Sequence, residues 1–174
     1  MVLTWDDFRG EPPPSRTEEA AQIVYSLDLA YEVSLVPRNG GYFASLEHAD
    51  LKISVLRERS WVHPWARNPA VLRHEQGHLD IAEAFRRLFL TKLGGLSCRG
   101  KTPEEAFAEL RACVRELFDT TLSQLEKLQE LYDRETGHGT DPVAQAAWEE
   151  RITDWLLSPE LLLSFIRKVL AKGP

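Results

Sequence analysis

Residues 71–90 read VLRHEQGHLDIAEAFRRLFL, and the interpretation of the whole chain depends on this stretch. In a helix, positions i and i+4 lie on one face, so His74 and His78 direct two imidazoles to the same place. Paired imidazoles at this spacing bind Zn²⁺, and Glu75 beside the first can take a proton from metal-bound water. The sequence therefore predicts zinc as cofactor, His74 and His78 as metal ligands and Glu75 as catalytic base. Two ordinary helix histidines are the alternative.

The motif lies in a segment with the features of an amphipathic helix. Asn68 can cap it, Pro69 suits the first helical position, and two glycines follow the last apolar residue. One stripe is apolar: Leu72, Leu79, Ala82, Phe85 and Leu88. Gly77 costs a helix about 1 kcal/mol relative to alanine, which is easier to understand if a substrate or another segment comes close. We expect a helix from Asn68 to about Leu93.

Residues 21–57 carry strand signals instead. Partial alternation of apolar and polar residues marks three segments: 23–36, 42–48 and 51–56. Asn39 and the two glycines after it have the composition of a hairpin turn. We expect about three antiparallel strands, the first pair joined at this turn. A loop-like N-terminal arm, residues 1–20, precedes them, with Trp5 and Phe8 as the expected anchors.

Residues 68–174 carry helix signals throughout. Behind a capping box at Thr102–Glu105, apolar residues recur every three or four positions as far as Tyr132, which predicts a helix of about 30 residues. Two further helix starts, each a capping residue followed by proline, stand at Asp141-Pro142 (for a helix to about Leu157) and Ser158-Pro159.

These segments predict an α+β fold in a single domain, residues 1–174. A small antiparallel sheet of about three strands is followed by four helices, zincin-like, with the HExxH motif on the first long helix. The net charge of −6, with acids and bases interleaved, provides no basic face for nucleic acid. Apolar runs are too short for a transmembrane segment.

A catalytic zinc site needs a third protein ligand, and the motif helix does not provide one. At about 100° per residue, Asp80 and Glu83 point away from the metal. The extended HExxHxxGxxH pattern is absent. We favour His138, which glycines flank at a helix end, so that its side chain can turn back toward a facing helix. Other candidates remain open: Glu104, Glu105, His48 and His63.

Other residues near the motifs could assist catalysis. Tyr132 is a candidate donor to the reaction's oxyanion, although it also ends an apolar stripe and could instead pack in the core. Metal-bound histidines usually donate their second N–H to a carboxylate or carbonyl. Three acids are candidates for that role, or are otherwise solvated helix charges: Asp80, Asp133 and Glu135. Gln76 could contact substrate or face water.

The two cysteines lie in the segment after the motif helix. Cys113 falls on the next helix and Cys98 in the loop before it. The helix would carry Cys113 about 16 Å from Thr102, whereas a disulfide needs Cα atoms within about 7 Å. We therefore expect two free thiols.

Several motifs resemble the bacterial domain-of-unknown-function family 922. They are LTWDDFRG at 3–10, LRHEQGHLDIAE at 72–83 and YDRETGHG at 132–139, followed by Gln145, Trp148 and Ile152. Members are described as predicted secreted zinc-dependent proteases. The resemblance implies His74 and His78 as ligands, Glu75 as catalytic acid/base and His138 as third ligand. It also implies secretion, whereas the chain as given begins without a signal peptide and would on that basis be cytoplasmic.

The motif and the resemblance together predict a zinc metallopeptidase acting on a peptide or protein substrate. One alternative is a zinc hydrolase of a non-peptide amide or ester. Another is a non-catalytic binding or scaffold module, in which His48 or His63 would close the site as a fourth ligand. The sequence does not indicate an oligomeric state.

Overall fold

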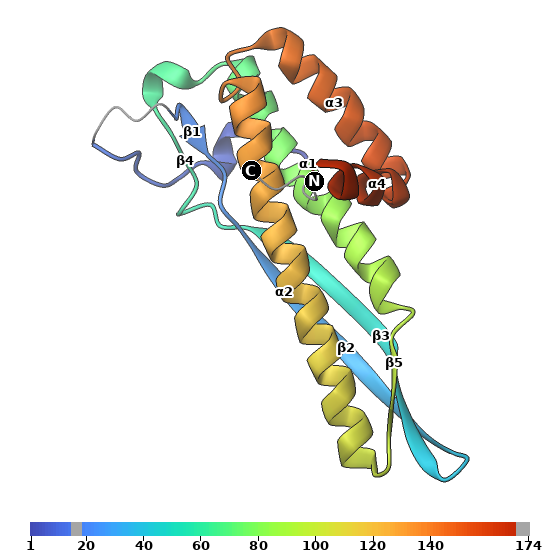
Figure 1. Ribbon diagram of the computed structural model, residues 1–174. Helices are drawn as coiled ribbons and strands as arrows, with labels where there is room; N and C mark the ends of the chain where they lie inside the picture. Colours follow the sequence, from blue (N-terminus) through green and yellow to red (C-terminus); the bar gives the residue numbers. More distant parts are fainter. Residues whose placement is uncertain (15–18, 170–174) are drawn as a thin grey trace.

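The computed structural model describes residues 1–14 and 19–169. Within these residues the architecture is α+β, with four α-helices and two small antiparallel sheets (Figure 1). The molecule is elongated along its longest helix, with a β-hairpin at one end and the last two helices toward the other (Figure 1). The predicted α+β class, with a small antiparallel sheet and four helices, is therefore confirmed.

The four helices are α1 (Pro69–Leu93), α2 (Pro103–Thr136), α3 (Pro142–Leu157) and α4 (Pro159–Val169). Asn68, Thr102 and Asp141 cap the first three, since each side chain accepts backbone N–H groups of the first turn. Gly137 ends α2 in the left-handed conformation, with φ of 57°. All the predicted helix starts are confirmed. They could be predicted because each start depends on a few neighbouring residues.

The larger sheet has the strand order β2-β3-β5. Strands β2 (Tyr25–Arg38) and β3 (Gly41–Val55) form a long hairpin whose turn has positive φ at Asn39 and Gly40, as its composition predicted. The expected second and third strands are in fact one strand, β3. A register shift between Glu32 and Val33 lets its ladder with β2 continue past the break in alternation.

The third strand of this sheet lies where the sequence suggested a loop. Strand β5 (Ser97–Gly100) follows α1 and pairs with β3, opposite Tyr42–Ser45. Four residues are too few to show the alternation by which strands are recognised. A second sheet pairs β1 (Ala21–Gln22) with β4 (Trp61–Val62), each equally short.

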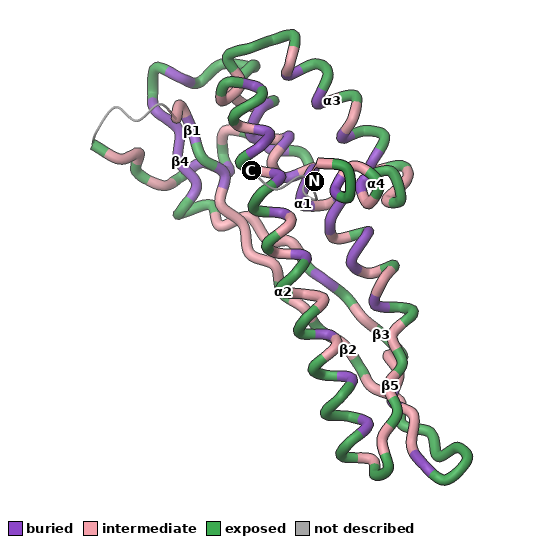
Figure 2. The backbone as a smooth tube through the Cα atoms, viewed as in Figure 1, coloured by how far each residue is buried: buried purple, intermediate pink, exposed green. Residues whose placement is uncertain are grey.

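Helix α1 is the centre of the packing. It contacts α2, α3, α4 and β3, and most of its inner face is buried (Figure 2). The N-terminal arm packs on the same helix through Leu3 and Phe8, which cluster with Leu79, while Trp5 lies half-exposed against Phe8. Gln76 ties the arm down, because its side chain accepts from Leu3 N at 2.7 Å. Residues 15–18 of the predicted arm lie outside the described residues.

The separation predicted for the cysteines is wrong, although both thiols are free. The Sγ atoms of Cys98 and Cys113 are 3.4 Å apart. The chain reverses between β5 and α2, so the first turns of α2 run back alongside β5. Gly100 allows this approach, since a Cβ there would lie 2.2 Å from Ala106 N.

In the described ranges, 1–14 and 19–169, the helices are all too short or too polar to cross a membrane.

A candidate metal centre between α1 and α2

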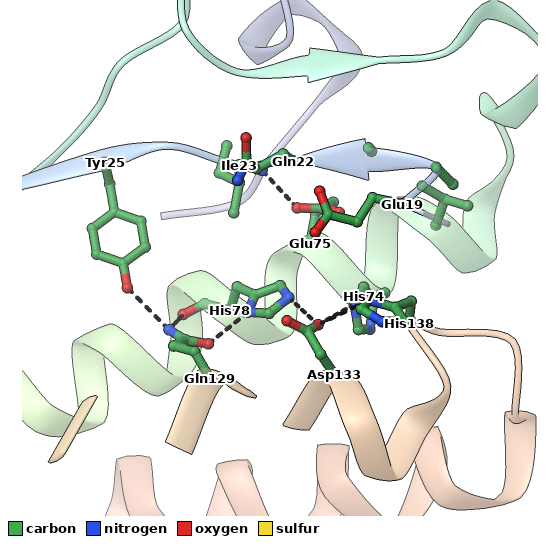
Figure 3. Close-up of a pocket in the computed structure, with 13 residues that line it drawn as sticks. Glu19, Gln22, Ile23, Tyr25, His74, Glu75, His78, Gln129, Asp133 and His138 are labelled. Carbon is green, nitrogen blue, oxygen red and sulfur yellow. Dashed lines mark hydrogen bonds and ion pairs between the residues drawn. The ribbon is translucent and has the colours of Figure 1, made fainter. Parts of the chain in front are cut away.

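Three side chains from two helices meet at one point beside α1. Asp133, near the C-terminal end of α2, places Oδ1 3.1 Å from His74 Nε2 and 2.9 Å from His78 Nε2 (Figure 3). Their ligand atoms all lie within 4.8 Å of one another. Two imidazoles and a carboxylate are donors that divalent transition metals accept. This cluster could therefore hold a metal ion.

Two glutamines determine which ring nitrogens face the cluster. His78 Nδ1 donates to Gln129 Oε1 at 2.5 Å, and His74 Nδ1 donates to Gln145 Oε1 at 3.2 Å. The amide of Gln129 is oriented in turn, because its Nε2 donates to Tyr25 Oη and to the His78 carbonyl, each at 2.9 Å. Nε2 of each ring hydrogen bonds to Asp133 here; with Nδ1 holding its proton for the glutamine, loss of the Nε2 proton would leave the lone pair of Nε2 for a metal.

The cluster carries negative charge at its centre. Burial alone would raise the pKa of Asp133, but hydrogen bonds from the two histidines lower it well below its usual range. Burial alone would lower the pKa of His78, yet the hydrogen bond to Asp133 and the nearby charge of Glu75 raise it. Asp133 is thus an ionised carboxylate, the form that binds a cation.

Glu75 lies beside the histidines and is only 3 % exposed. Its Oε2 accepts from Ile23 N at 2.7 Å, which holds the carboxylate against the segment that enters β2 (Figure 3). Burial raises the pKa of Glu75, opposed by His78, His74 and the Ile23 N–H. A carboxylate with a raised proton affinity suits general-base chemistry.

A cavity of about 210 Å³ gives access to these groups. Its helical wall holds the cluster, Glu75 and Gln129. The facing wall is residues 19–23, which include β1, together with Tyr25 (Figure 3). Within the described chain β1 pairs only with β4, so its other edge is not part of a ladder. The cavity therefore lies between the His74–His78–Asp133 cluster and the edge of β1.

His138 lies next to the cluster but outside its tightest part. It has a left-handed backbone, with φ of 52°, and its Nδ1 is 3.8 Å from Asp133 Oδ1. Its side chain lines the cavity. The chain thus returns to the motif as expected, but Asp133 rather than His138 comes nearest to both histidines.

The other candidate ligands lie elsewhere. His48 is exposed on β3, and His63 stacks against Trp65. Glu105 accepts from Lys101 N at the start of α2, about 42 Å along the helix from Asp133 at 1.5 Å per residue. The neighbouring Glu104 shares that position. Among the described residues, the group whose ligand atoms lie together contains His74, His78 and Asp133 and none of these four.

Tyr132 is fully buried behind the cluster and is not among the described residues that line the cavity. Its hydroxyl donates to the His74 carbonyl at 3.1 Å and accepts from Gln145 Nε2 at 2.8 Å. Burial raises the pKa of Tyr132 above its ordinary value. This placement fits the alternative in which Tyr132 packs in the core.

The close approach of Tyr132 accounts for the glycine in HEQGH. A Cβ at Gly77 would lie 2.2 Å from Tyr132 Oη. Another segment does come close to this position, as the helix cost of glycine suggested.

The acids proposed to support the histidines separate into two groups. Of the three acids, Asp133 contacts the histidines. The other two bond elsewhere: Asp80 accepts from Gln76, and Glu135 accepts from Trp148 Nε1. Gln129 was missed in the sequence. The one signal available was its position four residues before Asp133, on the same face of α2.

Comparison with known proteins adds one finding. Residues 59–139 match the family model described as "Bacterial protein of unknown function (DUF922)". The matched segment is therefore similar to that family over somewhat less than half of the chain. It contains α1 and α2, and with them the His74–His78–Asp133 cluster, Glu75 and His138, so the resemblance seen in the motifs at 72–83 and 132–139 is confirmed. No curated protein and no solved structure matches the chain.

Proposed function

We propose that this protein is a zinc-dependent metallopeptidase in which His74, His78 and Asp133 bind the metal and Glu75 is the general base. One observation carries the proposal: both Nε2 atoms point at a single carboxylate oxygen, next to a buried glutamate, at the wall of a cavity. In this proposal Asp133 replaces His138 as the third ligand. His138 lies beside that carboxylate and does not bind the metal.

The donor atoms fit zinc in both kind and spacing. Ligand atoms about 2.0–2.1 Å from a tetrahedral zinc lie about 3.3–3.4 Å from each other. The two nitrogen–oxygen separations, 3.1 and 2.9 Å, need only a slight expansion, and the three ligand atoms all lie within 4.8 Å of one another. Three protein ligands leave one coordination position open, as catalytic zinc sites require.

Bound zinc would supply Lewis acidity, which lowers the pKa of a water ligand and polarises a carbonyl group. Glu75 would accept the proton of the attacking water and deliver it to the leaving amine. The Ile23 N–H holds one oxygen of this carboxylate, so its orientation is set before substrate arrives. Gln129 and Gln145 hold the two imidazoles in a single tautomer.

The facing wall of the cavity supports a peptide as substrate. Residues 19–23 line it, and β1 presents an unpaired strand edge within the described chain. An extended peptide can add to such an edge through main-chain hydrogen bonds, which position its carbonyl groups along the cavity.

The direct test is Glu75→Gln. The amide still accepts from Ile23 N but takes no proton, so we expect hydrolysis of a protein substrate to fall by about 10²–10⁴-fold while one zinc per chain is retained. Glu104→Gln, at the far end of α2, is the matched control and should keep full activity. Full activity in Glu75→Gln would exclude the general-base role, and a purified protein that takes up no zinc would exclude the proposal.

A further inference from the structure

A second depression opens beside the cavity, between β2 and α2. This β2–α2 groove has a volume of about 490 Å³. It is lined by Tyr25, Leu27, Phe118, Leu122, Leu125, Glu126, Gln129 and Glu130. Tyr25 and Gln129 line the cavity as well, and their hydrogen bond, 2.9 Å long, stands at the boundary between the two. A chain lying in the cavity can therefore place a neighbouring side chain in the groove.

The lining of the groove is apolar but only partly covered. Leu125 is buried, whereas Leu27, Phe118 and Leu122 are half-buried, so they expose apolar surface inside a concave site. Covering such surface with a large apolar side chain strengthens binding by about 10–100-fold. Concave apolar surface next to convergent polar groups is the usual form of a ligand site.

The charges around the groove have one sign. Glu126 and Glu130 lie on successive turns of α2 at its edge and are both exposed. Among the described residues that line the two spaces, none is lysine or arginine. The field therefore attracts a basic side chain and repels an acidic one.

The groove and the metal cluster share a side chain. Gln129 forms part of the groove wall through its contact with Tyr25, and its Oε1 accepts from His78 Nδ1. A side chain seated in the groove would thus lie one residue away from a candidate ligand histidine. This connection makes the groove a continuation of the site instead of a separate surface feature.

We propose that the β2–α2 groove is a specificity subsite, which takes a large apolar side chain of a peptide whose neighbouring residue is lysine or arginine. The inference rests on the proposed peptidase function, because it names the substrate class of that site. The apolar lining selects the first residue, and Glu126 and Glu130 select the second.

Binding to the zinc-loaded full chain carrying Glu75→Gln tests this, because the peptides stay uncleaved. Three fluorescent peptides, otherwise of glycine and serine, contain Leu-Lys, Leu-Glu or Gly-Lys. We expect Leu-Lys to bind at least about tenfold more tightly than Gly-Lys, from apolar burial. Its advantage over Leu-Glu should be about 2–5-fold for each groove glutamate and should shrink with added salt.

Two sets of variants separate the contributions. Leu122→Asn should remove most of the preference for leucine, and Glu126→Gln with Glu130→Gln should remove the preference for lysine. The matched control is Glu116→Gln with Asp119→Asn, two exposed acids on α2 outside the groove, which should change neither. The glutamate variants are exposed and should fold normally, so they decide the matter even if Leu122→Asn is unstable.

The outcomes also separate the two proposals. Equal binding of the three peptides, or no binding, overturns the subsite, whatever the wild-type chain cleaves. A lysine preference that the glutamate variants abolish, when the wild-type chain cleaves no peptide, supports the groove as a peptide-binding site and overturns the peptidase.

Discussion

The two ends of helix α2 are built in different ways. The N-terminal end, near Pro103, packs Ala106 and Leu110 against β3 and the end of α1, and its polar groups are capped locally. The C-terminal end holds Gln129 and Asp133 against α1, where each hydrogen bonds to a histidine. One helix therefore joins an apolar packing surface to a partly buried polar network.

The two ends of α2 should differ in how many substitutions they tolerate. Apolar packing tolerates many combinations of side chains, since any residues of suitable volume can fill the space. A buried polar network needs every partner in position, because an unsatisfied buried group is costly. Substitutions should therefore affect metal binding at one end of α2 and only stability at the other.

The largest effect is expected at the metal end. Asp133→Asn removes the ionised carboxylate, and zinc affinity should fall by more than about 100-fold, the upper range for groups that only support a ligand. His138→Ala should cost less than about tenfold. Competition with a chromophoric chelator measures both, and Asp119→Asn, exposed on the same helix, is the control.

The same pair of variants distinguishes the ligand sets. A greater loss in His138→Ala than in Asp133→Asn would make His138 the third ligand. Losses above 100-fold in both would indicate four protein ligands, a closed site of structural type, and would contradict the peptidase.

At the other end of α2, the expected effect is on stability alone. Oxidised glutathione should convert the Cys98 and Cys113 thiols to a disulfide, releasing two reduced glutathiones. The bond closes a loop between residues 15 apart, worth about 3 kcal/mol, or about 6–12 °C in Tm. Burial and the neighbouring Cys113 raise the pKa of Cys98 to about 11, so oxidation at pH 7 should be slow.

Mass spectrometry and thermal unfolding with and without reductant measure this change. Cys113→Ser is the control and should show no shift on oxidation. Zinc affinity should stay the same in the oxidised chain, because the sulfurs lie at the end of α2 opposite the cluster. A change in zinc affinity would contradict the separation of the two ends.

The smallest effect concerns the contact between the helices. Gly77→Ala should destabilise the fold by about 1–3 kcal/mol despite the better helix propensity of alanine, because its Cβ meets the Tyr132 hydroxyl. Gly94→Ala, at the end of α1, meets nothing closer than 3.7 Å and should be neutral or slightly stabilising. Denaturant unfolding compares the two, and equal stabilities would mean that Tyr132 does not pack on α1.

Half of the candidate site could be predicted from the sequence. The i, i+4 spacing places His74 and His78 on one face of a helix, and Asn68 and Pro69 show where that helix begins. The return of the segment around His138 was also foreseen. From the sequence, Asp133 was a candidate only for hydrogen bonding to the histidines and not for binding the metal. Spacing within one helix says nothing about which side chain of another helix comes nearest.

The sequence by itself determined the helices, the hairpin turn and the histidine pair, since each depends on residues a few positions apart. Only the tertiary structure decided that Asp133 and Gln129 bind the histidines, across 59 and 51 residues of chain, and that β5 brings Cys98 to Cys113. The physical reason is the same in each case. Local signals set the direction of the chain, whereas the partner of a buried polar group is set by how the elements pack.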